Sequence, residues 1–123
     1  MVNGPGHLEC KLEPLEAANV ITVRGELDLS NVHVLQDLCD RPTEGRRPLI
    51  IDLSEVSYID GTGLAVLMRT HERYQRRGIE FAVTFTSKLI QRIFSVFSLQ
   101  DRIHIFPTVS AAMKNLAHGA SGF

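Results

Sequence analysis

The sequence predicts an α/β protein with a mixed β-sheet of about five strands and about four helices, in the order β-β-α-β-α-β-α-β-α. Three observations indicate this fold class. Segments rich in β-branched residues alternate with segments of helical periodicity, as in folds whose helices connect the strands of a sheet. The segment LIIDL (49–53) is almost continuously apolar, which is typical of a strand covered on both faces. The chain has 123 residues, enough for one hydrophobic core without disulfides or metal.

The first half of the chain predicts two paired strands, a helix and a central strand. LECKL (8–12) alternates apolar and polar residues, the period of a half-buried strand. NVITVRG (19–25) is rich in β-branched residues and is close enough in sequence to pair with it as a hairpin. Ser30 is the expected cap of a first helix that ends in the region 42–45. LIIDL (49–53) follows as the central strand.

The second half predicts three helices that alternate with two strands. A helix begins after YIDGTG (58–63) and ends at Arg76, Arg77 and Gly78. The expected elements after it are the strand FAVTF (81–85), the helix SKLIQRIFSVF (87–97), the strand RIHIF (102–106) and a last helix that Thr108 caps and that runs through Leu116. The apolar residues of the segment 87–97 fall on one helical stripe, namely Leu89, Ile90, Ile93, Phe94 and Phe97.

We expect a single domain over residues 1–123, with a core at about 7–117 and short flexible ends, because no repeat, low-complexity segment or long linker divides the sequence. No segment approaches the ~20 apolar residues of a membrane span. The first residues have neither the basic region nor the apolar segment of an export signal. These features predict a cytoplasmic protein with no membrane partner.

Composition and residue spacing argue against several classes of function. The formal net charge of −1 offers no bulk attraction to nucleic acid. The histidines form no H-E-x-x-H or similar pair, and Cys10 and Cys39 lack a C-x-x-C spacing. The sequence therefore predicts no metal site and no cofactor, and it predicts that both cysteines are buried free thiols.

The segment YIDGTG (58–63) is the candidate functional loop, because it directly follows the central strand and places an acid and two glycines around one hydroxyl. A structural interpretation makes Asp60 the N-cap of the next helix, with its carboxylate bonded to N–H groups near Thr62 and Gly63, while Gly61 eases the turn. A nucleotide-binding interpretation is weaker, because the sequence has no P-loop and no G-x-G-x-x-G motif. The N–H groups at the helix N-terminus could still hold an anion. Catalysis by Thr62 would need an activating base, and the sequence indicates none beside this loop.

Three segments resemble the sulphate-transporter and anti-sigma-antagonist domain, usually shortened to STAS. They are RGELDLSNVHVL (24–35), LIIDLSEVSYIDGTGLAVL (49–67) and IQRIFSVFSLQDRIHIFPTVSAAM (90–113). The resemblance spans nearly the whole chain, and its most specific parts are G-E-L-D and D-L-S-x-V-x-Y-I-D-x-T-G-L, in the expected order and separation. A stand-alone domain of this size is most similar to the bacterial anti-sigma factor antagonists.

The resemblance implies partner switching in the regulation of transcription. The unmodified antagonist binds an anti-sigma factor that is a histidine-kinase-like protein kinase, and this partner then releases its sigma factor; the antagonist itself is not an enzyme. In this family the phospho-acceptor is a Ser or Thr directly after the loop Asp, where this sequence has Gly61. Thr62 is therefore the possible acceptor. The implied partner-binding residues are Asp28, Asp60, Gly61, Thr62 and Gly63.

Asp28 and a row of arginines can each be interpreted in two ways. Asp28 is equally explained by a capping role at the start of the first helix, together with Ser30. One side of the helix after the loop carries four arginines that suit a solvated helix face or a contact with an acidic partner or nucleic acid, namely Arg69, Arg73, Arg76 and Arg77. For the function, the alternative of a different class is a small-ligand or nucleotide-binding STAS regulatory module that uses the helix N-terminus.

Overall fold

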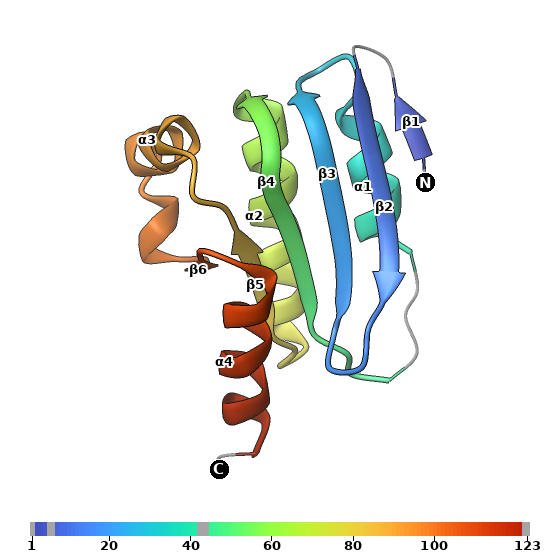
Figure 1. Ribbon diagram of the computed structural model, residues 1–123, viewed down its shortest axis with the longest axis vertical. Coiled ribbons are helices and arrows are strands. Elements are labelled where there is room, and N and C mark those ends of the chain that lie inside the picture. The colour runs from blue at the N-terminus through green and yellow to red at the C-terminus, as the bar shows by residue number, and fades with distance from the viewer. Residues whose placement is uncertain (1, 5–6, 42–44, 122–123) are drawn as a thin grey trace.

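A computed structural model describes residues 2–4, 7–41 and 45–121, and within them six strands form one mixed sheet in the order β1-β2-β3-β4-β5-β6 (Figure 1). The strands are β1 (Val2–Gly4), β2 (Leu8–Pro14), β3 (Asn19–Leu27), β4 (Leu49–Ile59), β5 (Phe81–Thr84) and β6 (His104–Phe106). The helices are α1 (Val32–Cys39), α2 (Gly61–Arg76), α3 (Lys88–Val96) and α4 (Val109–Ser121), with a 3-10 turn η1 (Leu99–Asp101) before β6.

The pairing of the strands confirms the predicted α/β fold. β1, β2 and β3 pair antiparallel, whereas β3, β4, β5 and β6 pair parallel. The five predicted strands are all present, and β1 precedes them as a sixth that was not predicted. Its three residues are too few to show a periodic pattern. β2 and β3 form the expected hairpin, and a helix lies in each connection between consecutive parallel strands.

The central position of β4 explains the apolar run that begins it. Ile51 lies in register with Ile21 of β3 and with Val83 of β5, and all three side chains are fully buried under α1 and α2. Its neighbour Ile50 points to the other face, where it packs with Ala112 and the rest of a smaller cluster under α4. Figure 1 shows α1 and α2 on one face of the sheet and α4 on the other. Because helices cover both faces here, the strand has no polar alternation.

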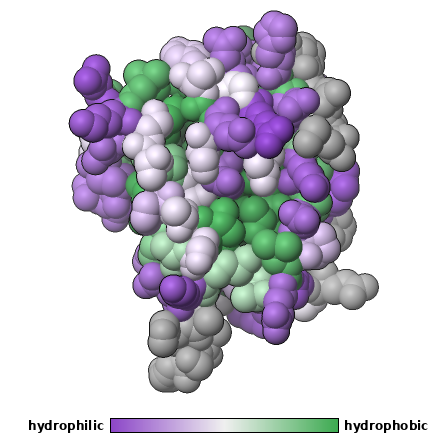
Figure 2. All heavy atoms as spheres, in the orientation of Figure 1, coloured by the Kyte–Doolittle hydropathy of each residue, from purple (hydrophilic) through white to green (hydrophobic). Residues whose placement is uncertain are grey.

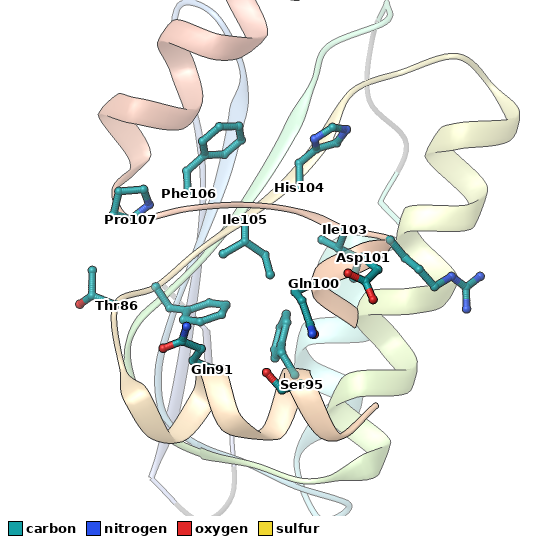
Figure 3. Close-up of a pocket in the computed structure, with 13 residues that line it drawn as sticks. Thr86, Gln91, Ser95, Gln100, Asp101, Ile103, His104, Ile105, Phe106 and Pro107 are labelled. Carbon is teal, nitrogen blue, oxygen red and sulfur yellow. The ribbon is translucent and has the colours of Figure 1, made fainter. Parts of the chain in front are cut away.

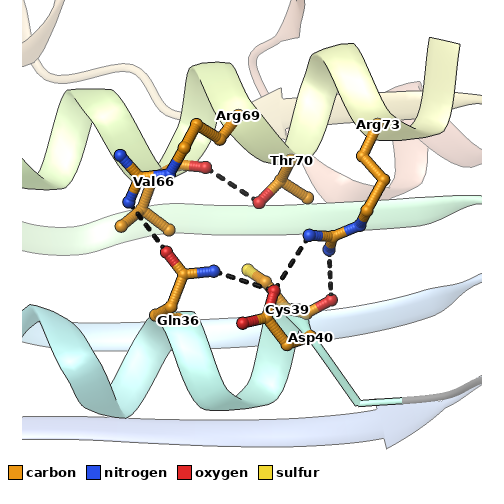
Figure 4. Close-up of polar contacts among 7 residues, drawn as sticks. All are labelled: Gln36, Cys39, Asp40, Val66, Arg69, Thr70 and Arg73. Carbon is orange, nitrogen blue, oxygen red and sulfur yellow. Dashed lines mark hydrogen bonds and ion pairs between the residues drawn. The ribbon is translucent and has the colours of Figure 1, made fainter. Parts of the chain in front are cut away.

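Two arginines of α2 hold this helix against α1 (Figure 4). The Arg73 guanidinium donates to Asp40 Oδ1 at 2.9 Å and to the Cys39 carbonyl oxygen at 2.6 Å, and Arg69 donates to Gln36 Oε1 at 2.9 Å. The interpretation of the arginine row as a solvated face therefore holds for Arg69, which is exposed, whereas Arg73 is partly buried against α1. A cation at the carbonyl end of α1 complements the dipole of that helix. The other two arginines, Arg76 and Arg77, are exposed.

The predicted boundaries of the first helix need correction. Asn31, not Ser30, occupies the N-cap position of α1, and Ser30 instead donates from Oγ to Asp28 Oδ1 at 2.6 Å. The helix ends at Cys39, before the predicted region 42–45, of which residues 42–44 lie outside the described residues. Gly45 is the first described residue after that gap and lies in a turn with φ +69°.

Several other boundaries differ by a few residues. β4 continues to Ile59, beyond the apolar segment 49–53, because β3 pairs with it as far as the Leu27 and Ile59 partners. η1 was not predicted, and β6 begins only at His104. The predicted cap of α4 is confirmed, since Thr108 accepts from the Ala111 N–H. Ser87, which begins the predicted helix 87–97, is the N-cap of α3 and accepts from the Ile90 N–H.

Both cysteines are buried and free, as predicted. Burial raises the pKa of Cys10 to about 12 and the pKa of Cys39 to about 11. The two thiols therefore stay protonated at neutral pH and behave as small apolar side chains. Among the helices that the structure describes, none is both long and apolar enough to span a bilayer.

Candidate functional site

The candidate loop lies where β3 and β4 end next to each other. Leu27 and Ile59 are partners in the parallel ladder, so the two acids that follow these strands start from adjacent positions. The Asp60 N–H donates to the Leu27 carbonyl oxygen at 3.1 Å, and the Leu29 N–H donates to Asp60 Oδ2 at 3.1 Å. The carboxylate of Asp60 thus ties the loop before α1 to the loop before α2. This contact joins the two segments whose residues the family resemblance implies as partner-binding.

Asp60 caps α2 in the predicted way. Its Oδ1 accepts the backbone N–H groups of Thr62 at 2.9 Å and Gly63 at 3.1 Å, and its backbone is extended, with φ −101° and ψ −176°. The same oxygen also accepts the Thr62 hydroxyl at 2.5 Å. One carboxylate therefore satisfies N–H groups at the start of the helix and holds the candidate acceptor side chain.

The electrostatics of the loop keep Asp60 ionised. Partial burial alone would raise its pKa, but hydrogen bonds from the Thr62 hydroxyl and from the N–H groups of Gly63, Thr62 and Leu29 outweigh that effect. The pKa of Asp60 is therefore lowered from its ordinary value. A carboxylate whose pKa is lowered in this way is a weak general base, so the contact orients the Thr62 hydroxyl more than it activates it.

The two glycines of the loop serve different purposes. Gly61 is exposed, its φ is not positive, and a Cβ added to it would meet no atom within 4 Å. Gly63 is buried, and a Cβ there would lie 2.7 Å from Ile59 Cγ1 and 2.9 Å from Leu27 Cδ2. Gly63 therefore lets α2 pack closely on the ends of β3 and β4, whereas Gly61 leaves an open space at the surface.

Asp28 takes part in the turn that precedes α1. Its Oδ1 accepts the Ser30 N–H at 2.9 Å, and its carbonyl oxygen accepts the Val32 N–H at 2.8 Å. Its own N–H donates to Asn31 Oδ1 at 3.0 Å. These contacts agree with the local role at the start of the helix. A contact of Asp28 with a partner stays a prediction.

An apolar groove beside Gly61 is the feature that the sequence did not reveal. It runs between α2 and α3 as two adjoining hollows of about 270 and 300 Å³, both bordered by Gly61, Leu64 and Phe97. We call it the α2–α3 groove. Two large apolar side chains that line it are exposed: Val96 (72%) and Phe97 (57%). Figure 2 shows hydrophobic side chains at the surface over α3.

The predicted stripe of α3 is therefore only partly buried. Ile90 and Phe94 are in the core, whereas Leu89 and Phe97 are exposed. Val96 was the available signal, because it is a large apolar residue outside the stripe formed by Ile90, Ile93, Phe94 and Phe97. Clusters of exposed apolar side chains mark interaction sites more often than solitary ones do.

The arrangement favours binding over bond-making chemistry. Within the described residues, no group of three or more His, Cys, Asp or Glu side chains is placed to hold a metal ion. Two N–H groups at the start of α2, those of Thr62 and Gly63, already bond to Asp60 and are not available to an external anion. What the loop offers to a partner is an exposed backbone at Gly61, a hydroxyl at Thr62 and the apolar groove beside them.

Comparisons with known proteins agree with this fold. A family model described as the STAS domain matches residues 11–112. The anti-sigma-F factor antagonist RsfA of Mycobacterium tuberculosis is 28% identical over 109 residues, which cover 86% of this chain and 85% of that protein. The anti-sigma-B factor antagonist of Staphylococcus aureus is 31% identical over 86 residues, covering 69% and 80% of the two chains.

A solved structure of similar shape is the crystal structure of an anti-sigma factor antagonist from Mycobacterium paratuberculosis. It superposes with a TM-score of 0.81 and covers 94% of this chain and 99% of that one, at 21% sequence identity. A likeness at this identity shows the fold alone.

Proposed function

Because the chain belongs to the STAS domain family, we propose that it is an anti-sigma factor antagonist, which binds a kinase-type anti-sigma factor in the cytoplasm and thereby frees a sigma factor. The names of its relatives support this class of function. The observation that carries the proposal is the α2–α3 groove next to Gly61, which combines exposed apolar side chains with a backbone that no side chain covers.

The partner would cover the loop and the groove together. Phe97 and Val96 supply apolar area, while Gly61 allows close approach to the first turn of α2. Thr62, and Asp28 on the neighbouring loop, supply polar groups at the edge of this area. Interfaces of this kind gain most of their affinity from a few buried aromatic side chains, surrounded by contacts that exclude water. We therefore expect Phe97 to contribute more to affinity than Asp28.

Phosphorylation would act by changing this surface. A phosphoryl group adds about −1.5 to −2 charge, and at the edge of an apolar interface this charge would lose its water without gaining a counter-charge. The family's acceptor position is Gly61, which has no oxygen to modify. We propose that the protein is biased toward its unmodified, partner-binding state, with Thr62 as a slow acceptor.

The structure offers less support for a small-ligand or nucleotide-binding module at the same helix N-terminus. Asp60 already accepts the N–H groups of Thr62 and Gly63, so a phosphate would have to displace a carboxylate that belongs to the protein. The Asp60 carboxylate, whose pKa is lowered, is ionised and would also repel an anionic ligand at that point. We propose that the chain has no catalytic residue of its own.

A binding experiment with a matched pair of variants tests the proposal. Phe97 and Leu89 are both exposed apolar residues of the α3 segment, but only Phe97 borders the α2–α3 groove. Calorimetric titration against a panel of the host's kinase-type anti-sigma factors should give one complex. Phe97→Ala should weaken that complex about tenfold or more, the effect of removing an aromatic anchor, while Leu89→Ala leaves it unchanged. Equal effects of the two variants would show that the partner binds elsewhere.

A further inference from the structure

The exposed surface of α3 carries positive charge without negative charge. The helix and its two caps, residues 87–97, contain Lys88 and Arg92 but no aspartate or glutamate. Both side chains are exposed, and neither forms an ion pair with any other residue that the structure describes. The charge of this helix is therefore available to a group from outside the chain.

Arg92 lies at the outer rim of the α2–α3 groove. It comes four residues before Val96, which lines the groove, and residues four apart are neighbours on the surface of a helix. Lys88 lies one turn further from Val96. Another side of α3 is neutral, since Gln91 and Ser95 line a separate cavity beside β6 (Figure 3). Of the two cations of this helix, Arg92 is therefore the one that a molecule in the groove would meet.

The acids of the neighbouring strands and loops already bind groups of the protein. Asp60 accepts backbone N–H groups with both of its carboxylate oxygens. Asp28 accepts the Ser30 N–H at 2.9 Å, and Glu55 of β4 forms an ion pair with Arg24 at 2.8 Å. None of these carboxylates is bonded to a cation of α3.

A partner that covers Val96 and Phe97 would also displace water from the adjacent Arg92. A guanidinium that loses its water without gaining acceptors weakens a complex. A carboxylate of the partner would compensate this loss, because it can accept two parallel hydrogen bonds from the planar guanidinium. A cation at the same place would be repelled. Arg92 thus favours a partner with negative charge at this rim.

The same charges match an anionic membrane poorly. Segments that recognise lipid headgroups carry about 4 to 8 cations, whereas α3 has only Lys88 and Arg92. The Asp60 carboxylate borders the groove at its other end and would repel a continuous anionic surface. A protein can place a carboxylate at Arg92 and keep it away from Asp60. The charge distribution therefore favours a protein segment over a membrane.

We propose that the partner segment that covers the α2–α3 groove carries a carboxylate on the side that faces α3, and that this carboxylate pairs with Arg92 in the complex. Its apolar side chains contact Val96 and Phe97. The inference rests on the proposed function, because it describes the contact surface of that partner. Arg92 then selects among kinase-type anti-sigma factors of similar shape by their charge at this position.

Calorimetric titration with the kinase-type anti-sigma factor that binds the wild type provides the test. Arg92→Glu should weaken the complex at least about tenfold, because it brings two negative charges together. Lys114→Glu, at an exposed lysine of α4 outside the groove, changes the net charge equally and should bind normally. Arg92→Gln removes only the charge, so its affinity should fall less steeply with added salt than that of the wild type.

The possible outcomes separate this inference from the proposed function. A wild-type complex that Arg92→Glu weakens no more than Lys114→Glu does would overturn the inference and leave the proposed function intact. Equal salt dependence of the wild type and Arg92→Gln would also overturn it. Binding to phosphatidylglycerol vesicles that Arg92→Glu abolishes, without an effect on the protein complex, would assign α3 to a membrane instead. A wild type that binds none of the host's anti-sigma factors would contradict both proposals.

Discussion

The Thr62 hydroxyl donates to Asp60 Oδ1 over 2.5 Å, and this oxygen also accepts the N–H groups of Thr62 and Gly63. The helix cap and the candidate phospho-acceptor therefore share one oxygen. A phosphoryl group on Thr62 would remove the hydroxyl proton that makes this bond and would bring a second negative charge next to an ionised carboxylate. The hydrogen bond between Thr62 and Asp60 thus opposes phosphorylation of Thr62, and the sequence motif alone did not predict this effect.

The first prediction concerns phosphorylation. Incubation with the cognate kinase and ATP should modify the wild-type chain slowly or not at all, whereas Gly61→Ser should become modified at the new serine, because the space at Gly61 is open. Adjacent residues in a helix are rotated by ~100°, which misplaces Thr62 for a kinase aligned on position 61. Intact-mass measurement and peptide mapping read the outcome, with Thr62→Ala as control. Rapid stoichiometric modification of the wild type that disappears in Thr62→Ala would contradict it.

The second prediction concerns the cap of α2. Asp60→Ala should lower the free energy of unfolding by about 1 to 2 kcal/mol, the upper part of the range for N-cap residues, because the lost carboxylate also binds the Leu29 N–H. Asp60→Asn keeps an acceptor oxygen and should lose less. Urea unfolding measures both. Equal losses in the two variants would mean that the charge, not the hydrogen bonds, stabilises the loop.

The third prediction separates the two glycines. Gly63→Ala should lower the free energy of unfolding by about 1 to 3 kcal/mol, since the added methyl group overlaps Ile59 and Leu27 in the core. Gly61→Ala should leave the stability within about 0.5 kcal/mol of the wild type or raise it slightly, as an alanine suits the first turn of a helix. Thermal unfolding of the two variants and the wild type measures these differences in stability. The reverse order of stability would show that the packing around Gly63 is looser than described.

The fourth prediction concerns acid stability. The folded-state pKa of Asp60 is lowered from its ordinary value of 3.8, so its contribution is present above that value and lost as the pH falls through the folded pKa. The wild type should therefore lose more stability than Asp60→Asn when the pH is lowered below about 4. Chemical unfolding of both proteins between neutral pH and the acid limit of folding tests this. Parallel pH profiles would assign the acid loss to other carboxyl groups.

Sequence patterns predicted the fold because its strongest signals are local. The segment 49–53 is apolar on both faces, and in the sheet Ile50 and Ile51 do contact two different clusters. β1 and η1 escaped prediction because three residues are too short for a period to be visible. The cap of α1 was misplaced by one residue, since Ser30 and Asn31 are both favoured at such a position and only tertiary contacts decide between them.

The site was predicted less completely than the fold. The capping bonds of Asp60 follow from its place before a helix, so they were predictable from the sequence. The contact between Asp60 and the Leu29 N–H joins positions that are 31 residues apart and depends on the parallel pairing of β3 and β4. The exposure of Phe97 depends on how α3 lies on the sheet, and a helical stripe does not show which of its members reach the core.

Release of a sigma factor from its complex tests the proposed function more directly than any stability measurement. A preformed complex of the cognate kinase-type anti-sigma factor with its sigma factor is titrated with the purified chain, and free sigma factor is measured by size-exclusion chromatography. The wild type and Leu89→Ala should release the sigma factor stoichiometrically, whereas Phe97→Ala and Asp28→Ala should release little of it. The proposed function would be contradicted if the wild type at saturating concentration released no sigma factor from any such complex of the host. It would also be contradicted if Phe97→Ala and Asp28→Ala released as much sigma factor as the wild type.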